Sequence, residues 1–158
     1  MKAVSVVKIR KELHHRSHDE LMELCLRLSK FKKENKELLT YLLFEAHNEE
    51  QYIETVIEEL DEQFETINTN SFYYIKKSIR KILRNLKKYA RYSQKKETEV
   101  ELLLYFCQKL NDFTPNIHRN ITLSKLYDRQ ILSIKKLVAG LHEDLQYDYN
   151  LRLEELED

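Results

Sequence analysis

The densest group of side chains that could bind a metal lies near the N-terminus. His14, His15 and His18 lie close together, and Asp19 follows directly. Imidazole nitrogens bind Zn²⁺ and other transition metals, and His14 and His18 would share one face of a continuous helix. Ser17, however, reads as the start of a new helix, which would break that alignment. We therefore interpret the three histidines as weak candidates for a metal site and, in preference, as an exposed turn.

The two cysteines are the remaining candidates for covalent chemistry. Cys25 and Cys107 each lie among leucines, where burial disfavours the thiolate that a nucleophile needs. Neither has a histidine beside it, and the chain lacks a glycine-rich phosphate loop, a Gly-x-Ser-x-Gly turn and the zinc motif His-Glu-x-x-His. We expect two buried thiols in a reducing compartment, and no cofactor. A metal- or thiol-dependent enzyme is the least favoured function class.

The charge of the chain reverses halfway along it. The stretch 37–75 contains ten acidic residues and no Lys or Arg, whereas 76–96 contains ten Lys or Arg and no acidic residue. The formal net charge of the whole chain is zero. A neutral total gives no general attraction to nucleic acids or membranes, but a single charged helix face can attract a partner of opposite charge.

Helical geometry places most of this charge on outward faces. At about 100° per residue, the side chains opposite the buried stripe form a basic ridge on 76–96 and an acidic face on 37–65. The ridge comprises Lys77, Lys81, Arg84, Lys88, Arg91 and Lys95, and the acidic face comprises Glu54, Glu58, Glu62 and Glu65. On the flanks, Glu59 or Asp61 can pair with Lys76, Arg80 or Lys87, at about 0–1 kcal/mol for each exposed pair.

The composition predicts an all-α fold. One glycine, Gly140, and one proline, Pro115, are too few for the turns of a β-rich fold or for phosphate loops. Apolar residues recur at three- and four-residue spacing, and caps such as Ser17 with Glu20 or Thr98 with Glu101 mark helix starts. The predicted helices span 4–15, 18–32, 34–46, 49–67, 71–93, 98–113, 119–139 and 142–156, with 18–46 alternatively one bent helix.

Short connections between these helices force neighbours to run antiparallel. We expect one domain over 1–158, built as an up-and-down array of six to eight helices, with an irregular multi-helix bundle as the alternative. Residues 1–16 would form an N-terminal arm helix, and the acidic tail 150–158 is expected to fray. The segments 38–44 and 102–107 should lie at the centre because they are apolar on nearly every side.

The charged faces favour recognition over catalysis. We expect a non-catalytic binding or scaffold module that presents the acidic stretch 37–65 and the basic stretch 76–96 to a protein partner or to a second copy of itself. The alternative is binding of nucleic acid or another polyanion through 76–96, because the ridge spacing suits phosphate contacts. No apolar stretch reaches membrane-spanning length. We therefore predict a cytoplasmic protein with no membrane partner and no small-molecule substrate.

Overall fold

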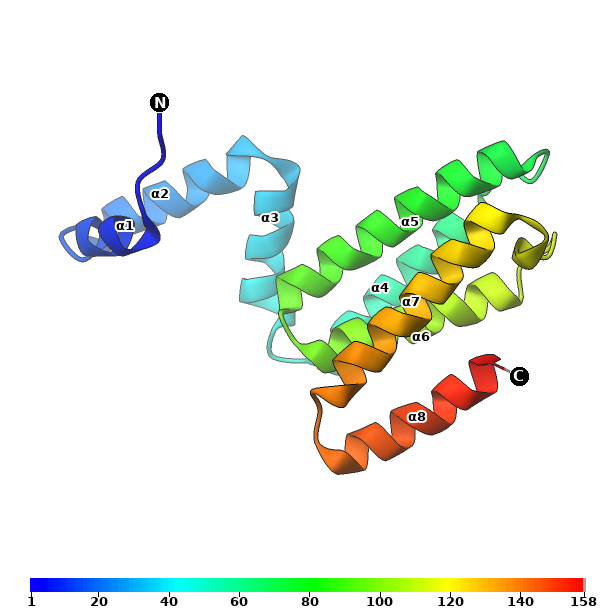
Figure 1. Ribbon diagram of the computed structural model, residues 1–158. Helices are drawn as coiled ribbons and strands as arrows, with labels where there is room; N and C mark the ends of the chain where they lie inside the picture. Colours follow the sequence, from blue (N-terminus) through cyan, green and yellow to red (C-terminus); the bar gives the residue numbers. More distant parts are fainter. Residues whose placement is uncertain (158) are drawn as a thin grey trace. The chain divides into compact units, whose positions relative to one another are not determined.

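The computed structural model describes residues 1–157, and every regular element in that range is a helix (Figure 1). The α-helices are α1 Val6–Leu13, α2 His18–Phe31, α3 Lys33–Thr40, α4 Glu49–Glu65, α5 Phe72–Ser93, α6 Lys96–Asn111, α7 Ile121–Ala139 and α8 Glu143–Glu157. A π-helical turn at Tyr41–Glu45 follows α3, and a 3₁₀ turn at Ile117–Arg119 precedes α7. The predicted all-α fold is confirmed, and each predicted helix has a counterpart in the structure.

Side-chain caps mark the starts of α1, α2, α4 and α7, whereas the start of α6 differs from its prediction. Ser17 Oγ accepts the backbone N–H of Glu20 at 3.2 Å, and the Glu20 carboxylate accepts the N–H of Ser17 at 3.4 Å. This reciprocal pair is the capping box that the sequence predicts. The prediction that Thr98 caps α6 is wrong, because α6 begins at Lys96 and Thr98 is buried within its first turn.

The chain divides into two compact units, Met1–Phe44 and Glu45–Asp158. The N-terminal unit contains α1, α2 and α3, and the C-terminal unit contains α4 to α8. The grouping of 1–158 as one domain stays a prediction. The two units differ most in how much of their apolar surface is buried, and each is described by itself.

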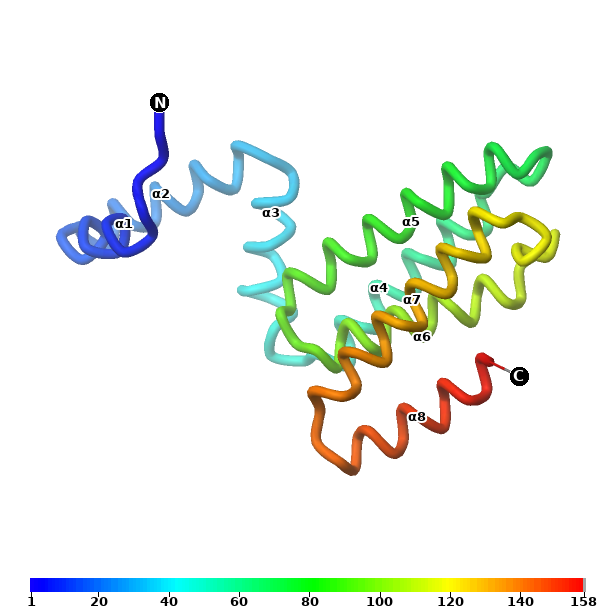
Figure 2. The backbone as a smooth tube through the Cα atoms, viewed as in Figure 1, coloured from blue at the N-terminus to red at the C-terminus, as the bar shows by residue number. Residues whose placement is uncertain are grey.

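The C-terminal unit holds the apolar core, with α6 at its centre. α6 packs against α4, α5, α7 and α8, and consecutive helices from α4 to α8 run in opposite directions (Figure 2). The buried side chains of α6 include Leu102, Leu103, Leu104, Phe106 and Cys107. Burying a large apolar side chain contributes about 1.5–3 kcal/mol relative to leaving it exposed. The antiparallel array and the central place of 102–107 are therefore confirmed.

A carboxylate on α6 anchors α8 to this core. The Tyr149 hydroxyl donates to Glu101 Oε1 at 2.9 Å, and Arg152 Nη1 lies 2.9 Å from the same oxygen. Burial, together with the hydrogen bond to Glu101, raises the pKa of Tyr149, so its hydroxyl is a proton donor at neutral pH. The helix is thus held by polar contacts as well as by its apolar stripe.

The acidic stretch 150–158 is described as far as Glu157. It is helical there, and Leu153 and Leu156 are buried. Asp158 lies outside the described residues. Fraying at the end of the stretch stays a prediction.

The N-terminal unit is divided by a break at Lys32. This residue has an extended backbone, with φ −139° and ψ 150°, so α2 ends before it and α3 starts after it. The alternative of one bent helix over 18–46 is therefore wrong. After Thr40 the chain continues as the π-helical turn, which places residues 41–45 on wider-spaced faces than an α-helix would.

The N-terminal unit buries almost none of its apolar side chains. Among residues 1–157, fifteen of the twenty-one large apolar side chains that are exposed lie in 1–44, and Tyr41 is the one buried apolar side chain of this unit. Leu42, Leu43 and Phe44 are exposed, so the prediction that 38–44 lies at the centre is wrong. A segment that is apolar on every side calls for a cover, but the pattern does not say that the same chain supplies it.

Candidate functional site

The predicted basic ridge lies on α5, and most of it is open to solvent. Lys77, Lys81, Arg84 and Arg91 are exposed, and none of them forms an ion pair within residues 1–157. Their charge is therefore available to a partner of opposite sign.

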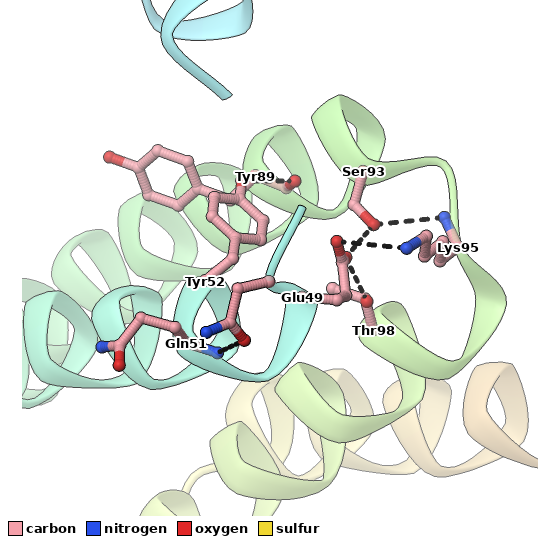
Figure 3. Close-up of polar contacts among 8 residues, drawn as sticks. Glu49, Gln51, Tyr52, Tyr89, Ser93, Lys95 and Thr98 are labelled. Atoms are coloured by element: carbon pink, nitrogen blue, oxygen red, sulfur yellow. Dashed lines mark hydrogen bonds and ion pairs between the residues drawn. The ribbon is translucent and has the colours of Figure 1, made fainter. Parts of the chain in front are cut away.

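The other two ridge residues have partners inside the protein. Lys88 Nζ lies 4.9 Å from the ring centre of Tyr89, which is the geometry of a cation–π contact. Lys95 Nζ lies 3.5 Å from Glu49 Oε2, so a carboxylate of α4 partly neutralises this end of the ridge (Figure 3). The ridge cations without a partner among the described residues are thus Lys77, Lys81, Arg84 and Arg91.

Glu49 lies at the centre of a polar cluster that joins the start of α4 to the connection between α5 and α6. Its Oε1 accepts hydrogen bonds from the hydroxyls of Ser93 and Thr98, the latter at 2.6 Å (Figure 3). Ser93 and Thr98 are buried, and the Glu49 side chain is 18% exposed. Because the carboxylate satisfies two buried hydroxyls and pairs with Lys95, we interpret the cluster as structural.

The predicted acidic face lies along α4. Glu54, Glu58, Glu62 and Glu65 are exposed, and none of the four forms an ion pair in the part of the chain that the structure describes. Like the basic ridge, this face keeps its charge in contact with solvent.

The flank pairing predicted between α4 and α5 is wrong, because the α4 carboxylates bond to other side chains. Glu59 Oε1 accepts the Tyr89 hydroxyl at 2.6 Å, and Asp61 Oδ1 lies 3.1 Å from Lys109 Nζ and accepts the Tyr105 hydroxyl. Burial acts to raise the pKa of Asp61, but the hydrogen bonds from Tyr105 and Lys109 outweigh it and lower that pKa. The expected partners on α5, Lys76, Arg80 and Lys87, therefore form no ion pair with these two carboxylates.

A groove of about 820 Å³ lies between α5 and α7. Its cationic lining consists of Lys76, Lys77, Arg80, Arg84 and Lys87 from α5 and Arg129 from α7. The lining contains no acidic side chain, and none of the six cations forms an ion pair among the described residues. A concave surface with charge of one sign concentrates counter-ions more strongly than a flat face does. We name this feature the basic groove.

The basic groove overlaps the predicted ridge only in part. Lys77 and Arg84 belong to both. The sequence interpretation missed three other α5 cations of the groove because it assigned them to flank pairs, and the lack of any acidic residue over 66–96 was the signal that could have identified them. Arg129 could not be found from the sequence, since nothing local shows that α7 lies across the groove from α5.

Gln130 lines the basic groove with an incompletely satisfied amide. Its side chain is 5% exposed, and its Nε2 donates to the Leu126 carbonyl at 3.2 Å. Its Oε1 has no hydrogen-bond partner within residues 1–157. Leaving a buried polar atom without a partner costs about 1–3 kcal/mol.

The histidine and cysteine candidates do not form a reactive centre. His14, His15 and His18 are exposed around the turn between α1 and α2, and no group of three or more His, Cys, Asp or Glu in the described range is arranged to hold a metal ion. Cys25 is exposed, so its predicted burial is wrong, whereas the predicted burial of Cys107 is confirmed. Burial raises the pKa of Cys107 to about 12, which disfavours its thiolate.

A second groove of about 820 Å³ lies within the N-terminal unit, between α1 and α2. Its apolar lining is Val4, Ile9, Leu13 and Leu24. Side chains of both charges surround this lining: Lys8, Arg16 and Arg27 together with Glu12, Asp19, Glu20 and Glu23. The groove therefore suits a helix whose apolar stripe is flanked by charges of both signs.

No protein-family model matches the chain, and comparisons with curated proteins and with solved structures find no match. Among residues 1–157, no helix combines the length and the apolar character that crossing a membrane requires. A functional proposal for this chain therefore depends on its charged surfaces, its two grooves and the exposed apolar side chains of residues 1–44.

Proposed function

We propose that the chain is a non-catalytic binding module that pairs with a second copy of itself through the apolar surface of residues 1–44. The observation that carries the proposal is the exposure of fifteen large apolar side chains in this unit, against one that is buried. A unit of this size without a buried core gains little stability from its own packing. So many exposed large apolar side chains in one small unit are typical of a surface that binds a partner.

The magnitudes favour association once part of this surface is covered. Pairing two chains opposes binding by about 4–15 kcal/mol through lost translational and rotational freedom. Burying one Leu or Phe side chain returns about 1.5–3 kcal/mol. Covering roughly six of the fifteen side chains therefore offsets the cost of association.

The charges around the α1–α2 groove favour a second copy as the occupant. Three cations and four anions surround the apolar lining, so the rim is nearly neutral and carries both signs. A two-fold contact between identical surfaces can place the cations of one copy against the anions of the other. A partner with charge of one sign would meet repulsion on part of the rim.

The acidic face and the basic ridge are kept as secondary contact surfaces in this proposal. An acidic face of one copy that met the basic ridge of another would form a head-to-tail contact, which extends into chains unless it closes into a ring. A two-fold contact through residues 1–44 closes by itself. For that reason the proposal assigns the main contact to the N-terminal unit.

Sedimentation velocity over a concentration series tests the proposal on the full chain. We expect a dimer for the natural sequence and a monomer for the double variant Leu28→Glu with Phe31→Glu. Both side chains belong to one face of α2, and they are 61% and 76% exposed, so their replacement spares the fold of the single chain. The matched control is Leu132→Glu with Ile121→Glu in the C-terminal unit, at 58% and 73% exposure, which we expect to stay dimeric.

Two results would contradict the proposal. One is a natural chain that sediments as a monomer at every concentration. The other is loss of the dimer in the control variant but not in the α2 variant, because the contact would then lie on the C-terminal unit.

A further inference from the structure

We propose that the basic groove between α5 and α7 binds single-stranded nucleic acid. All of its lining residues belong to the C-terminal unit, so the inference does not depend on pairing through residues 1–44. Three features of the groove contribute: its uniform charge, the spacing of its cations, and an aromatic side chain in its lining.

The charge of the groove favours a polyanion. Six cations line one concave surface without a carboxylate among them. Their mutual repulsion is relieved when phosphates replace the small counter-ions, and release of those counter-ions drives binding. A neutral ligand would gain nothing from this arrangement.

The spacing of the α5 cations favours a repeating chain of phosphates over one compact anion. Lys76, Arg80, Arg84 and Lys87 recur every three or four residues along the helix. Each step advances about 4.5–6 Å along the helix axis, an interval comparable with that between successive phosphates of an extended strand. Arg129 on α7 adds a contact from the opposite wall.

Tyr73 favours a strand whose bases are unpaired. It lines the groove near the start of α5, it is exposed, and its ring meets the ring of Tyr74 edge to face, with the ring centres 5.3 Å apart. An exposed aromatic face is a platform on which an unpaired base can stack. The bases of a duplex are already stacked on one another and are not offered to such a side chain. The groove therefore combines contacts to the backbone phosphates with a platform for an unpaired base of the ligand.

Fluorescence anisotropy with a dye-labelled single-stranded RNA of mixed sequence tests the inference on the full chain. We expect binding at low salt, with log affinity falling with log salt at a slope of about −3 to −4 if four to six cations contact phosphates. Arg80→Gln with Arg84→Gln should weaken binding about tenfold or more. Tyr73→Ala, which changes no charge, should weaken it about fivefold or more through lost stacking.

The same helix provides a matched control. Lys81→Gln with Arg91→Gln removes two exposed charges from α5, but neither residue lines the groove. We expect this variant to lose less than about threefold in affinity. Circular dichroism melting curves of all variants establish that each is folded, and Arg129→Gln repeats the test from the opposite wall.

Several outcomes would overturn the inference. Equal losses in the Arg80/Arg84 and Lys81/Arg91 variants would mean that the general field of α5 binds the strand. Duplex DNA or an acidic peptide that competes as well as the single strand, with no effect of Tyr73→Ala, would assign the groove to a different polyanion. Absence of binding at low salt would exclude nucleic acid as the ligand of the basic groove. We expect the Leu28/Phe31 variant, by contrast, to keep its binding, because all lining residues of the groove belong to the C-terminal unit.

Discussion

Replacement of Glu49 by alanine should destabilise the C-terminal unit far more than replacement of its neighbour Glu50. The Glu49 carboxylate accepts hydrogen bonds from two buried hydroxyls, those of Ser93 and Thr98, and pairs with Lys95. It thereby joins the start of α4 to the end of α5 and the start of α6. Removing it leaves those hydroxyls without their acceptor while the helices stay in place.

The expected cost follows from the burial of the partners. Each buried hydroxyl that loses its partner costs about 1–3 kcal/mol, with Ser93 at the lower end because its hydroxyl can turn to a carbonyl of its own helix. The half-exposed pair with Lys95 adds less than about 1 kcal/mol. The total is about 2–5 kcal/mol, or roughly 10–25 °C in Tm for a domain of about 100 residues. Glu49→Gln keeps an acceptor oxygen and should cost about 1 kcal/mol.

Urea unfolding followed by far-UV circular dichroism measures these costs, since the chain has no tryptophan to report by fluorescence. Glu50→Ala is the control, because Glu50 lies in the same first turn of α4 and is exposed. Both variants lose the same favourable interaction with the helix dipole, so the difference between them isolates the cluster. Equal unfolding midpoints for the two alanine variants would refute the structural role of Glu49.

Three other side chains lead to outcomes that can be measured. In a Cys25→Ser variant, Cys107 should react with a disulfide reagent only as fast as the protein unfolds, because burial raises its pKa to about 12; rapid labelling of the native protein would contradict this. The lowered pKa of Asp61 gives stability that is present above the unfolded value of about 3.9 and is lost as the pH falls through the folded value. Asp61→Asn should therefore flatten the acid side of the stability curve, measured by urea unfolding at a series of pH values. Phe106→Ala should cost about 3–5 kcal/mol in the same assay, whereas Leu132→Ala on the surface should change stability by less than about 0.5 kcal/mol.

Much of the fold could be predicted because each helix of the C-terminal unit carries its own apolar stripe. The run 102–107, apolar on nearly every side, correctly indicated the central helix. The same reasoning failed at 38–44. An apolar run indicates that a segment tends to be buried, but it does not indicate whether the same chain or a partner buries it. Cys25 was misplaced for the same reason. A local pattern reports the preference of a segment, and only tertiary contacts decide how that preference is met.

The candidate sites were less accessible to sequence reasoning. The helical wheel correctly placed Lys77, Lys81 and Arg84 on an exposed face, but it could not show that Lys95 meets Glu49 across a helix connection. The basic groove requires two helices that are far apart in sequence, so its α7 wall, with Arg129 and Gln130, had no local signal. Charge patterns locate a face well, whereas a concave site depends on which helices become neighbours.

The uneven distribution of the core between the two units has a consequence for how this protein tolerates change. In a library of random substitutions, those in the five-helix body should reduce cellular abundance, because they reach packed side chains. Those in the first three helices should leave abundance nearly unchanged and alter assembly instead. The sequence of the N-terminal unit is therefore free to diverge quickly and to change its binding partners, while the fold of the C-terminal unit stays the same.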